Sequence, residues 1–279
     1  MKNRKESPAE YNLRATFIYG RHMSKVDYQK EFCSLMEAFN HKYSRWNVWN
    51  DFLQITAISM ANVFPNEKTK EREETFKKII DKYSEEEYGV FAKMLRIIVD
   101  ALEDNPEQDF LGEVYHRLKL NQHQKGQFFT PYHICEFMGE IQADDIEKQL
   151  EEKDYITVSD PACGAGAMLI AFANVTLKHK VNYQQKVLFI AQDIDMTAAL
   201  MCYIQLSLLG CSAIVICGDS LAKPGLHPDN DVWITVMSYL NISKLNDFLS
   251  QEEKLPDVLI QKEYPEDKNG QLRLELVNG

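Results

Sequence analysis

The sequence predicts an α/β fold in which an all-helical N-terminal domain precedes a doubly wound parallel sheet. Two observations predict this class. Apolar residues recur at helical spacing from about residue 28 to residue 120, and short β-branched runs alternate with helix-length segments after residue 155. We therefore expect a helical domain at residues 1–124 and an α/β domain at residues 125–279.

The helical domain is predicted from apolar side chains that lie three and four residues apart. One such stripe runs from Phe32 to Phe39, and a later one runs from Phe91 to Leu102. The charged stretch from Glu67 to Lys78 fits a solvent-exposed helix face. Together these patterns predict a bundle of helices.

The sheet is predicted from four short runs rich in β-branched residues, at residues 155–159, 187–191, 213–217 and 232–236. The apolar segments 167–177 and 196–209 separate the first three runs and are long enough for crossover helices between parallel strands. An alternating pattern within residues 256–279 predicts a terminal hairpin.

Composition limits the classes of function. No run of eighteen apolar residues occurs, and the N-terminus is polar, so we expect a cytoplasmic protein that has no membrane contact. The six cysteines are scattered without metal-ligand spacing, so we expect reduced thiols and no metal. The net charge of -11 argues against a large basic surface. If the substrate is a nucleic acid, we therefore expect a partner to supply much of the binding affinity.

The strongest local motif is Asp160-Pro161-Ala162-Cys163-Gly164-Ala165-Gly166-Ala167, between the first predicted strand and its helix. Gly164 and Gly166 permit backbone angles and a close approach that side chains forbid, and the helix N-terminus offers free N–H donors. The motif suits a nucleoside cofactor. A plain strand-to-helix turn with two glycines is the alternative.

Two acidic motifs follow the next two predicted strands. Asp193, in Ala191-Gln192-Asp193-Ile194-Asp195, stands where a carboxylate can accept both ribose hydroxyls of a nucleoside. Asp193 or Asp195 can instead cap the next helix, and one can bind while the other caps. Asp219, before Ser220, can accept a hydrogen bond from an adenine amino group or simply form a turn.

Upstream, Lys125-Gly126-Gln127-Phe128-Phe129-Thr130-Pro131 precedes a helical run at residues 133–141. Thr130 can cap that helix and Pro131 can occupy its first turn. One of the two phenylalanines can pack on a cofactor while the other enters the core. A basic cluster before this loop contacts phosphates or complements a helix dipole; it comprises His116, Arg117, Lys119, His123 and Lys125.

Taken in order, GQFFTP, DPACGAG, AQDID and CGDSL resemble the motifs of the N6-adenine DNA methylase family, and the pattern is nearest to modification subunits of type I restriction-modification systems. The motifs span about residues 125–221. The resemblance implies a Rossmann-like S-adenosylmethionine-dependent methyltransferase sheet behind a helical N-terminal domain. It also implies methyl transfer to the N6 atom of adenine in DNA, with no metal required.

The resemblance assigns S-adenosylmethionine to a set of residues in this chain. The methionine part falls to Gln127, Phe129, Thr130, Pro131, Asp160, Gly164, Ala165, Gly166 and Ala167. Asp193 takes the ribose, Asp219 and Ser220 lie beside the adenine, and the side chains after Asp193 pack on its face. Family members commonly have Gly or Ser at the positions of Ala165 and Ala167, which is a mild departure.

A larger departure follows the fourth predicted strand, where the family places an Asn-Pro-Pro-aromatic tetrapeptide that polarises and stacks on the target base. Here that stretch is Val236-Met237-Ser238-Tyr239, in which Tyr239 alone can stack on a base. The implied partners are DNA, a specificity subunit and other copies of this chain, in a restriction-modification or mobile-element system. The alternative is a catalytically inactive module that binds the cofactor or other proteins.

Overall fold

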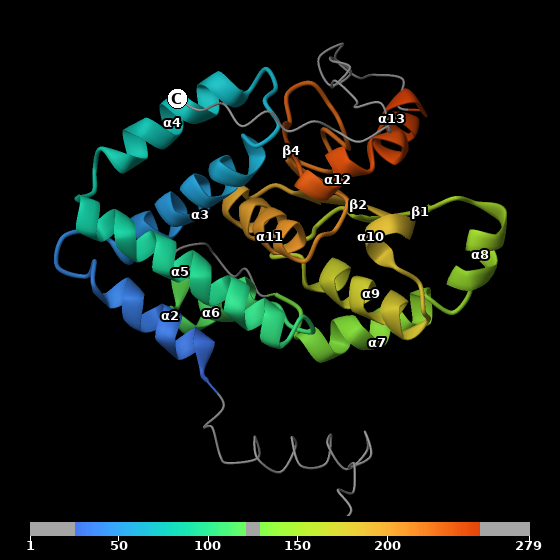
Figure 1. Cartoon of the computed structure of the whole chain (residues 1–279), viewed down its shortest axis with the longest axis horizontal. Coiled ribbons are helices and arrows are strands. Elements are labelled where there is room, and N and C mark those ends of the chain that lie inside the picture. Colours follow the sequence, from blue (N-terminus) through green and yellow to red (C-terminus); the bar gives the residue numbers. More distant parts are fainter. Residues whose placement is uncertain (1–25, 121–128, 252–279) are drawn as a thin grey trace, which may run out of the picture.

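The computed structural model describes residues 26–120 and 129–251, and Figure 1 shows their arrangement. The predicted hairpin within residues 256–279 and the predicted domain boundary after residue 124 lie outside the described residues. Within the described ranges, no helix has the length and hydropathy needed to cross a membrane.

The N-terminal part is helical, which confirms the prediction from apolar spacing. Its helices are α2 (Tyr28–Glu37), α3 (Arg45–Ala61), α4 (Thr69–Ile80), α5 (Glu85–Asp104) and α6 (Phe110–Arg117). Side chains that accept backbone N–H groups fix several starts, as in α5, where Ser84 and Glu87 form a reciprocal capping box. The stripes seen in the sequence converge on buried aromatic residues, including Phe32, Trp49 and Phe52.

The remaining residues form a four-stranded sheet with helices, so the α/β class is confirmed for the described residues. The strands are β1 (Ile156–Asp160), β2 (Val187–Asp193), β3 (Ala213–Cys217) and β4 (Asp231–Ile234), paired in the order β1-β2-β3-β4. The helices are α7 (Tyr132–Gln142), α8 (Ile146–Glu152), α9 (Ala167–Lys178), α10 (Tyr183–Lys186), α11 (Met196–Leu208), α12 (Val236–Leu240) and α13 (Ile242–Gln251). The predicted crossover segments correspond to α9 and α11.

Side-chain alternation divides the sheet into two buried faces. On β2, Phe189 packs into the core shared with α9, α11 and the helical part, whereas Ile190 faces the other side. That second face is covered by α13, through Leu245 and Leu249. Figure 1 shows α9 and α11 on one side of the strands and α12 and α13 on the other. The described helices thus cover both faces of the sheet at β2 and β3, whereas Thr157 and Ser159 of β1 are exposed.

The direction of β4 differs from the sequence prediction. β1, β2 and β3 are parallel, but β4 runs antiparallel to β3, with Cys217 opposite Asp231 and Ile214 opposite Ile234. A parallel neighbour needs a crossover, usually a helix, whereas β3 and β4 are joined by a loop at one edge of the sheet. The prediction of a fourth parallel strand was wrong because the short run of β4 carries no signal of direction.

Helix α4 covers the outer edge of β4 with one buried cation. The Arg72 guanidinium lies 3.8 Å from the Trp233 ring centroid and donates to the Val232 carbonyl at 2.8 Å. It also lies 3.6 Å from the Asp231 carboxylate. Because a planar guanidinium can stack and donate at once, Arg72 binds the helical part to the sheet edge.

A buried carboxylate links α6 to α11. Asp109, 4% exposed, accepts hydrogen bonds from the Gly112 N–H at 2.9 Å and from the Gln205 side-chain amide at 2.8 Å. Burial raises the pKa of Asp109 to about 6, although these two hydrogen bonds act in the opposite direction.

The raised pKa of Asp109 predicts how stability varies with pH. From its ordinary value of 3.8 up to about 6, the folded state binds more protons than the unfolded chain. The free energy of unfolding should therefore fall as pH rises through this window, by up to about 3 kcal/mol. Asp109→Asn should lack this fall. Urea denaturation of both proteins from pH 4 to pH 7 measures it, and a constant difference between the two across that range contradicts the assignment.

Candidate cofactor site

The three parallel strands end together at one edge of the sheet. Asp160 closes β1 opposite Ala191, and Asp193 closes β2 opposite Cys217. The turn after β1, the loop after β2 and the loop after β3 therefore emerge side by side at this carboxyl edge. In open α/β sheets, ligands bind outside the carboxyl ends of the strands.

The glycine turn after β1 has the backbone shape that the sequence predicts. Gly164 and Gly166 have φ values of +54° and +96°, which lie in the left-handed region. The Gly166 N–H donates to the Cys163 carbonyl at 2.8 Å, and the Cys163 N–H donates to the Gln192 carbonyl at 3.0 Å. The turn is thereby closed on itself and tied to β2.

Asp193 bonds directly to this turn. One carboxylate oxygen of Asp193 accepts the Gly164 N–H at 2.9 Å, and the other accepts the Asp195 N–H at 2.9 Å. Asp195 in turn caps α11 by accepting the Thr197 N–H at 2.9 Å. The two acids divide the roles that the sequence left open, since Asp195 caps the helix and Asp193 faces the turn. A carboxylate has acceptor capacity beyond two bonds.

Phe129 lies over the same turn. Its ring would be 2.9 Å from a Cβ atom placed on Gly164, so only a glycine fits beneath it. The Phe129 N–H donates to the His116 imidazole at 3.3 Å, and its ring packs 5.5 Å from that of Tyr115. Burial lowers the pKa of His116, which favours the neutral imidazole that can accept this bond.

Thr130 and Pro131 are the other described residues of the predicted GQFFTP loop, and they lead into α7. Gln127 and Phe128 lie outside the described residues. Thr130 is exposed and does not cap α7; Pro131 occupies the N-cap position, where its carbonyl accepts the Ile134 and Cys135 N–H groups. The helix thus starts one residue later than the predicted cap implies, because Pro131 stands just outside its first turn.

The carboxyl edge is electrostatically negative. Burial raises the pKa of Asp160, and the nearby charge of Asp193 raises it further. Asp160 also accepts the Ala162 N–H at 3.1 Å. A cation between or beside these two groups stabilises the ionised form of Asp160 next to Asp193, so this edge suits a positively charged ligand.

Asp219 begins the loop after β3. Its carboxylate accepts the Leu221 and Ala222 N–H groups at 2.9 and 3.1 Å, and these bonds lower its pKa. Asp219 therefore forms the turn that was one of its two predicted roles, while it remains at the carboxyl edge. Just before it, the Gly218 N–H donates to the Asp193 carbonyl at 2.9 Å. Ser220 is partly exposed in the same loop.

Comparison with known families shows which protein family this chain belongs to. The family model for N-6 DNA methylases matches residues 106–262, more than half of the 279-residue chain. The chain belongs to the N-6 DNA methylase family. The match begins before α6, so it includes the end of the helical part as well as the glycine turn and the strands of the sheet.

Two further comparisons add little. A search of the curated proteins finds no match. A solved structure described as a class I S-adenosylmethionine-dependent methyltransferase from Listeria monocytogenes is similar at a TM-score of 0.34 and 14% identity, covering 78% of this chain and 69% of that one. A likeness at this level does not bear on the site of this methylase family member.

The side chain directly after Asp193, which the sequence places on the adenine face, is Ile194, whereas Gln192 and Gln205 were not singled out from the sequence. Ile194 is 70% exposed immediately after Asp193, although it follows a fully buried strand. The buried Gln192 side chain donates to the Gly218 and Lys223 carbonyls and accepts the Gly225 N–H, which holds the loop after β3. Gln205 lies buried on α11. A polar residue inside an apolar segment was the available signal for both glutamines.

Tyr239 is placed away from this site, which corrects the expectation that it stacks on a target base there. Because β4 runs antiparallel, its end lies at the amino edge of the sheet, where the Thr235 N–H donates to the Ala213 carbonyl at 3.0 Å. Tyr239 stacks on Phe64 with ring centroids 4.6 Å apart. The length of β3 separates it from the glycine turn.

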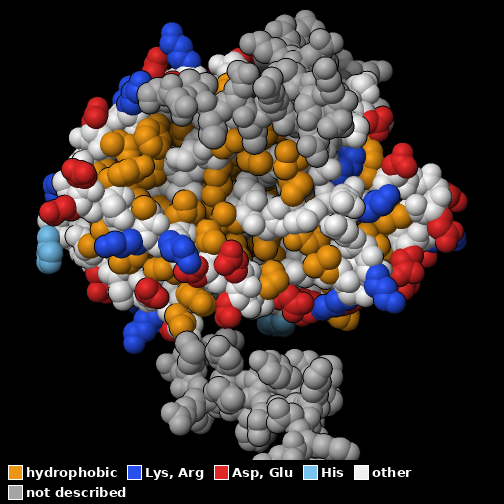
Figure 2. Space-filling view, viewed as in Figure 1, with side chains coloured by type: hydrophobic (Ala, Val, Ile, Leu, Met, Phe, Trp, Pro, Cys, Tyr) orange, Lys and Arg blue, Asp and Glu red, His pale blue; other side chains and the backbone are white. Residues whose placement is uncertain are grey.

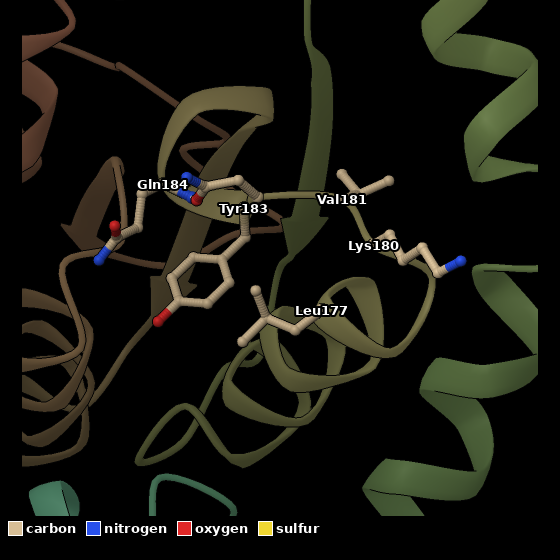
Figure 3. Close-up of a pocket in the computed structure, with 6 residues that line it drawn as sticks. Leu177, Lys180, Val181, Tyr183 and Gln184 are labelled. Carbon is tan, nitrogen blue, oxygen red and sulfur yellow. The ribbon is translucent and has the colours of Figure 1, made fainter. Parts of the chain in front are cut away.

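A hollow of about 390 Å³ also lies away from the glycine turn, where α9 ends and α10 begins. Figure 3 shows Leu177 and Tyr183 facing one another across it, with Lys180, Val181 and Gln184 around them. Gly166 stands at the opposite end of α9, about 18 Å away for a twelve-residue helix. None of the predicted cofactor residues lines this hollow.

The described surface carries mixed charge. On the face shown in Figure 2, Lys and Arg side chains are interspersed with Asp and Glu rather than gathered in one patch. Arg117, from the predicted basic cluster, pairs with Asp27 through two bonds of 3.0 and 3.1 Å. His123 and Lys125 of that cluster lie outside the described residues. Arg117 thus serves the helical part rather than a free phosphate site.

The glycine turn yields a direct prediction of stability. Gly166→Ala should lower the free energy of unfolding by roughly 1–2 kcal/mol, because an L side chain is strained at this φ and its Cβ would lie 2.9 Å from the Cys202 sulfur. Gly89→Ala is the control. It lies within α5 with nothing within 4 Å of the added Cβ, so stability should rise by about 0.5–1 kcal/mol. Denaturant titration compares them, and an unchanged Gly166→Ala protein refutes the strained turn.

Proposed function

We propose that this member of the N-6 DNA methylase family binds S-adenosylmethionine at the carboxyl edge of its sheet and acts as an adenine-specific (N6) DNA methyltransferase. The proposal includes the finer fold class, a Rossmann-like methyltransferase domain over residues 125–279 behind a helical domain over residues 1–124. Family membership supports the reaction class and DNA as substrate.

One observation carries the proposal. The Gly164 N–H bonds to the Asp193 carboxylate at 2.9 Å while the Phe129 ring lies against Gly164. These residues belong to three sequence motifs that are separated by tens of residues. The family resemblance assigns all three motifs to S-adenosylmethionine. Their meeting at one edge of the sheet is the arrangement that a shared cofactor requires.

The residues fit the chemistry of this cofactor. The first turn of α9 starts from Gly166 without a side-chain cap, so its N–H groups are available to a carboxylate. Asp193 has acceptor capacity for ribose hydroxyls, and Ile194 offers an exposed apolar surface to the adenine ring. The acidic edge of Asp160 and Asp193 complements a cation. When bound, S-adenosylmethionine supplies a methyl group activated on a positively charged sulfur.

The remaining assignments in this proposal follow from the family. The methionine part of S-adenosylmethionine is bound by further residues, namely Gln127, Thr130, Pro131, Ala165 and Ala167. The adenine part is bound by Asp219 and Ser220. We further propose a place in a restriction-modification or mobile-element system, as a relative of type I modification subunits. We also propose a cytoplasmic location, from the polar N-terminus and the lack of a long apolar run in the sequence. The net charge of -11 favours a specificity subunit as the source of DNA affinity. Other copies of this chain are a separate proposed partner.

A second function is favoured by a specific observation. The chain contains no Asn-Pro-Pro-aromatic tetrapeptide, and Tyr239 lies at the amino edge of the sheet. A module that binds the cofactor without methylating DNA, and that acts through contacts with other proteins, accounts for both facts.

Two measurements on the full chain separate these functions. Titration calorimetry with S-adenosylmethionine, with ATP as a comparison nucleotide, tests the cofactor site. Transfer of a labelled methyl group to unmethylated adenine-containing DNA, followed by nucleoside chromatography for N6-methyladenine, tests the reaction. Binding with transfer supports the methyltransferase, and binding without transfer supports the module. Absence of binding to S-adenosylmethionine refutes the methyltransferase and the cofactor-binding module, and leaves a module that binds only other proteins.

Ile194 provides a sharper test of the cofactor assignment. Because its side chain is 70% exposed, Ile194→Ser should barely change stability, yet it should weaken S-adenosylmethionine binding about tenfold by removing apolar surface that the adenine covers. Ile141→Ser on α7, where the side chain is 63% exposed, is the matched control and should leave affinity unchanged. Equal affinities for the two variants would exclude Ile194 from the site.

A further inference from the structure

Gln205 is a fully buried amide in the largely apolar helix α11. Its side-chain NH₂ group donates to the Asp109 carboxylate at 2.8 Å and to the Ala165 carbonyl at 2.9 Å. Its side-chain oxygen accepts the Leu111 N–H at 3.0 Å. Both N–H donors and the oxygen are thus engaged, which is the condition for burying an amide without a large penalty.

The partners of Gln205 belong to two distant parts of the chain. Asp109 and Leu111 form the start of α6, in the helical part, whereas Ala165 stands between the two left-handed glycines of the turn after β1. The other end of α6 carries His116, which accepts the Phe129 N–H at 3.3 Å. Helix α6 is therefore connected to both sides of the candidate site, to the turn through Gln205 and to the ring above it through His116.

We infer that Gln205 is a positioning residue for the glycine turn, through which the packing of α6 determines the shape of the cofactor site. The inference rests on the proposed function of that turn. Glycines at 164 and 166 give the turn more accessible backbone states than other residues would. The bond from Gln205 fixes the peptide between them, so a ligand finds the turn already ordered and loses less conformational entropy on binding.

The test replaces Gln205 with an apolar side chain of similar length and follows the turn directly. In Gln205→Met, amide hydrogen exchange in peptides covering Gly164 and Gly166 should quicken about tenfold without ligand, because the Ala165 carbonyl loses its partner. The dissociation constant for S-adenosylmethionine should rise about tenfold. Exchange in peptides from β3 should stay as in the natural chain.

Asn241→Leu is the matched control. The Asn241 amide also makes three hydrogen bonds, to the Gln184 carbonyl, the Ser212 hydroxyl and the Met237 carbonyl, at 2.9, 2.9 and 3.1 Å. These bonds lie at the amino edge of the sheet, so this variant should lose thermal stability while the exchange of the turn and the affinity stay unchanged. If both variants behave alike at the turn, Gln205 has a general structural role and the inference fails.

The outcomes also separate this inference from the proposed function. If the natural chain does not bind S-adenosylmethionine but Gln205→Met still quickens exchange at the turn, the proposed function fails while the positioning role stands. If the natural chain binds and Gln205→Met changes neither exchange nor affinity, the positioning role fails alone. Should Gln205→Met not fold, Asp109→Ala removes one partner of Gln205 and should shift the same peptides in the same direction by less.

Discussion

The hydrogen bond from the Gly164 N–H to the Asp193 carboxylate is the interaction on which the candidate site depends. It joins the turn after β1 to the end of β2 at a point where burial makes an unpaired carboxylate costly. With it formed, the turn keeps its left-handed glycines beneath Phe129, and the next acid, Asp195, is free to cap α11. This one hydrogen bond thus holds both the backbone shape of the glycine turn and the contact of the turn with β2.

Much of the fold follows from the sequence because it is encoded by local patterns. Apolar spacing located the N-terminal helices, and the β-branched runs located the strands to within one or two residues. The glycine motif and the acidic motifs could be found because each directly follows a predicted strand, although a plain turn or a helix cap was an alternative for each. Parallel pairing of β1 and β2 brings the ends of these strands to one edge of the sheet, which places Asp193 near the turn after β1.

Other features depend on contacts that local patterns do not encode. The direction of β4 follows from the loop that joins it to β3, and its outer edge is covered by Arg72 from α4, 160 residues earlier in the chain. Gln205 and His116 act on the site through partners in other elements, so their roles become visible only when α6 is placed. The position of Tyr239 follows from the direction of β4. Because β4 was predicted to be parallel, Tyr239 was expected at the carboxyl edge of the sheet, whereas it lies at the amino edge.

The two edges of the sheet differ in how readily they can accept another strand. At β4, a new strand would have to displace the buried Arg72 guanidinium from the Val232 carbonyl and from the Trp233 ring. At β1, the outermost strand on the other side of the described sheet, Thr157 and Ser159 are exposed. A strand added at the edge of β1 would run beside Asp160. An added strand would then deliver its own terminal residues to the mouth of the glycine turn.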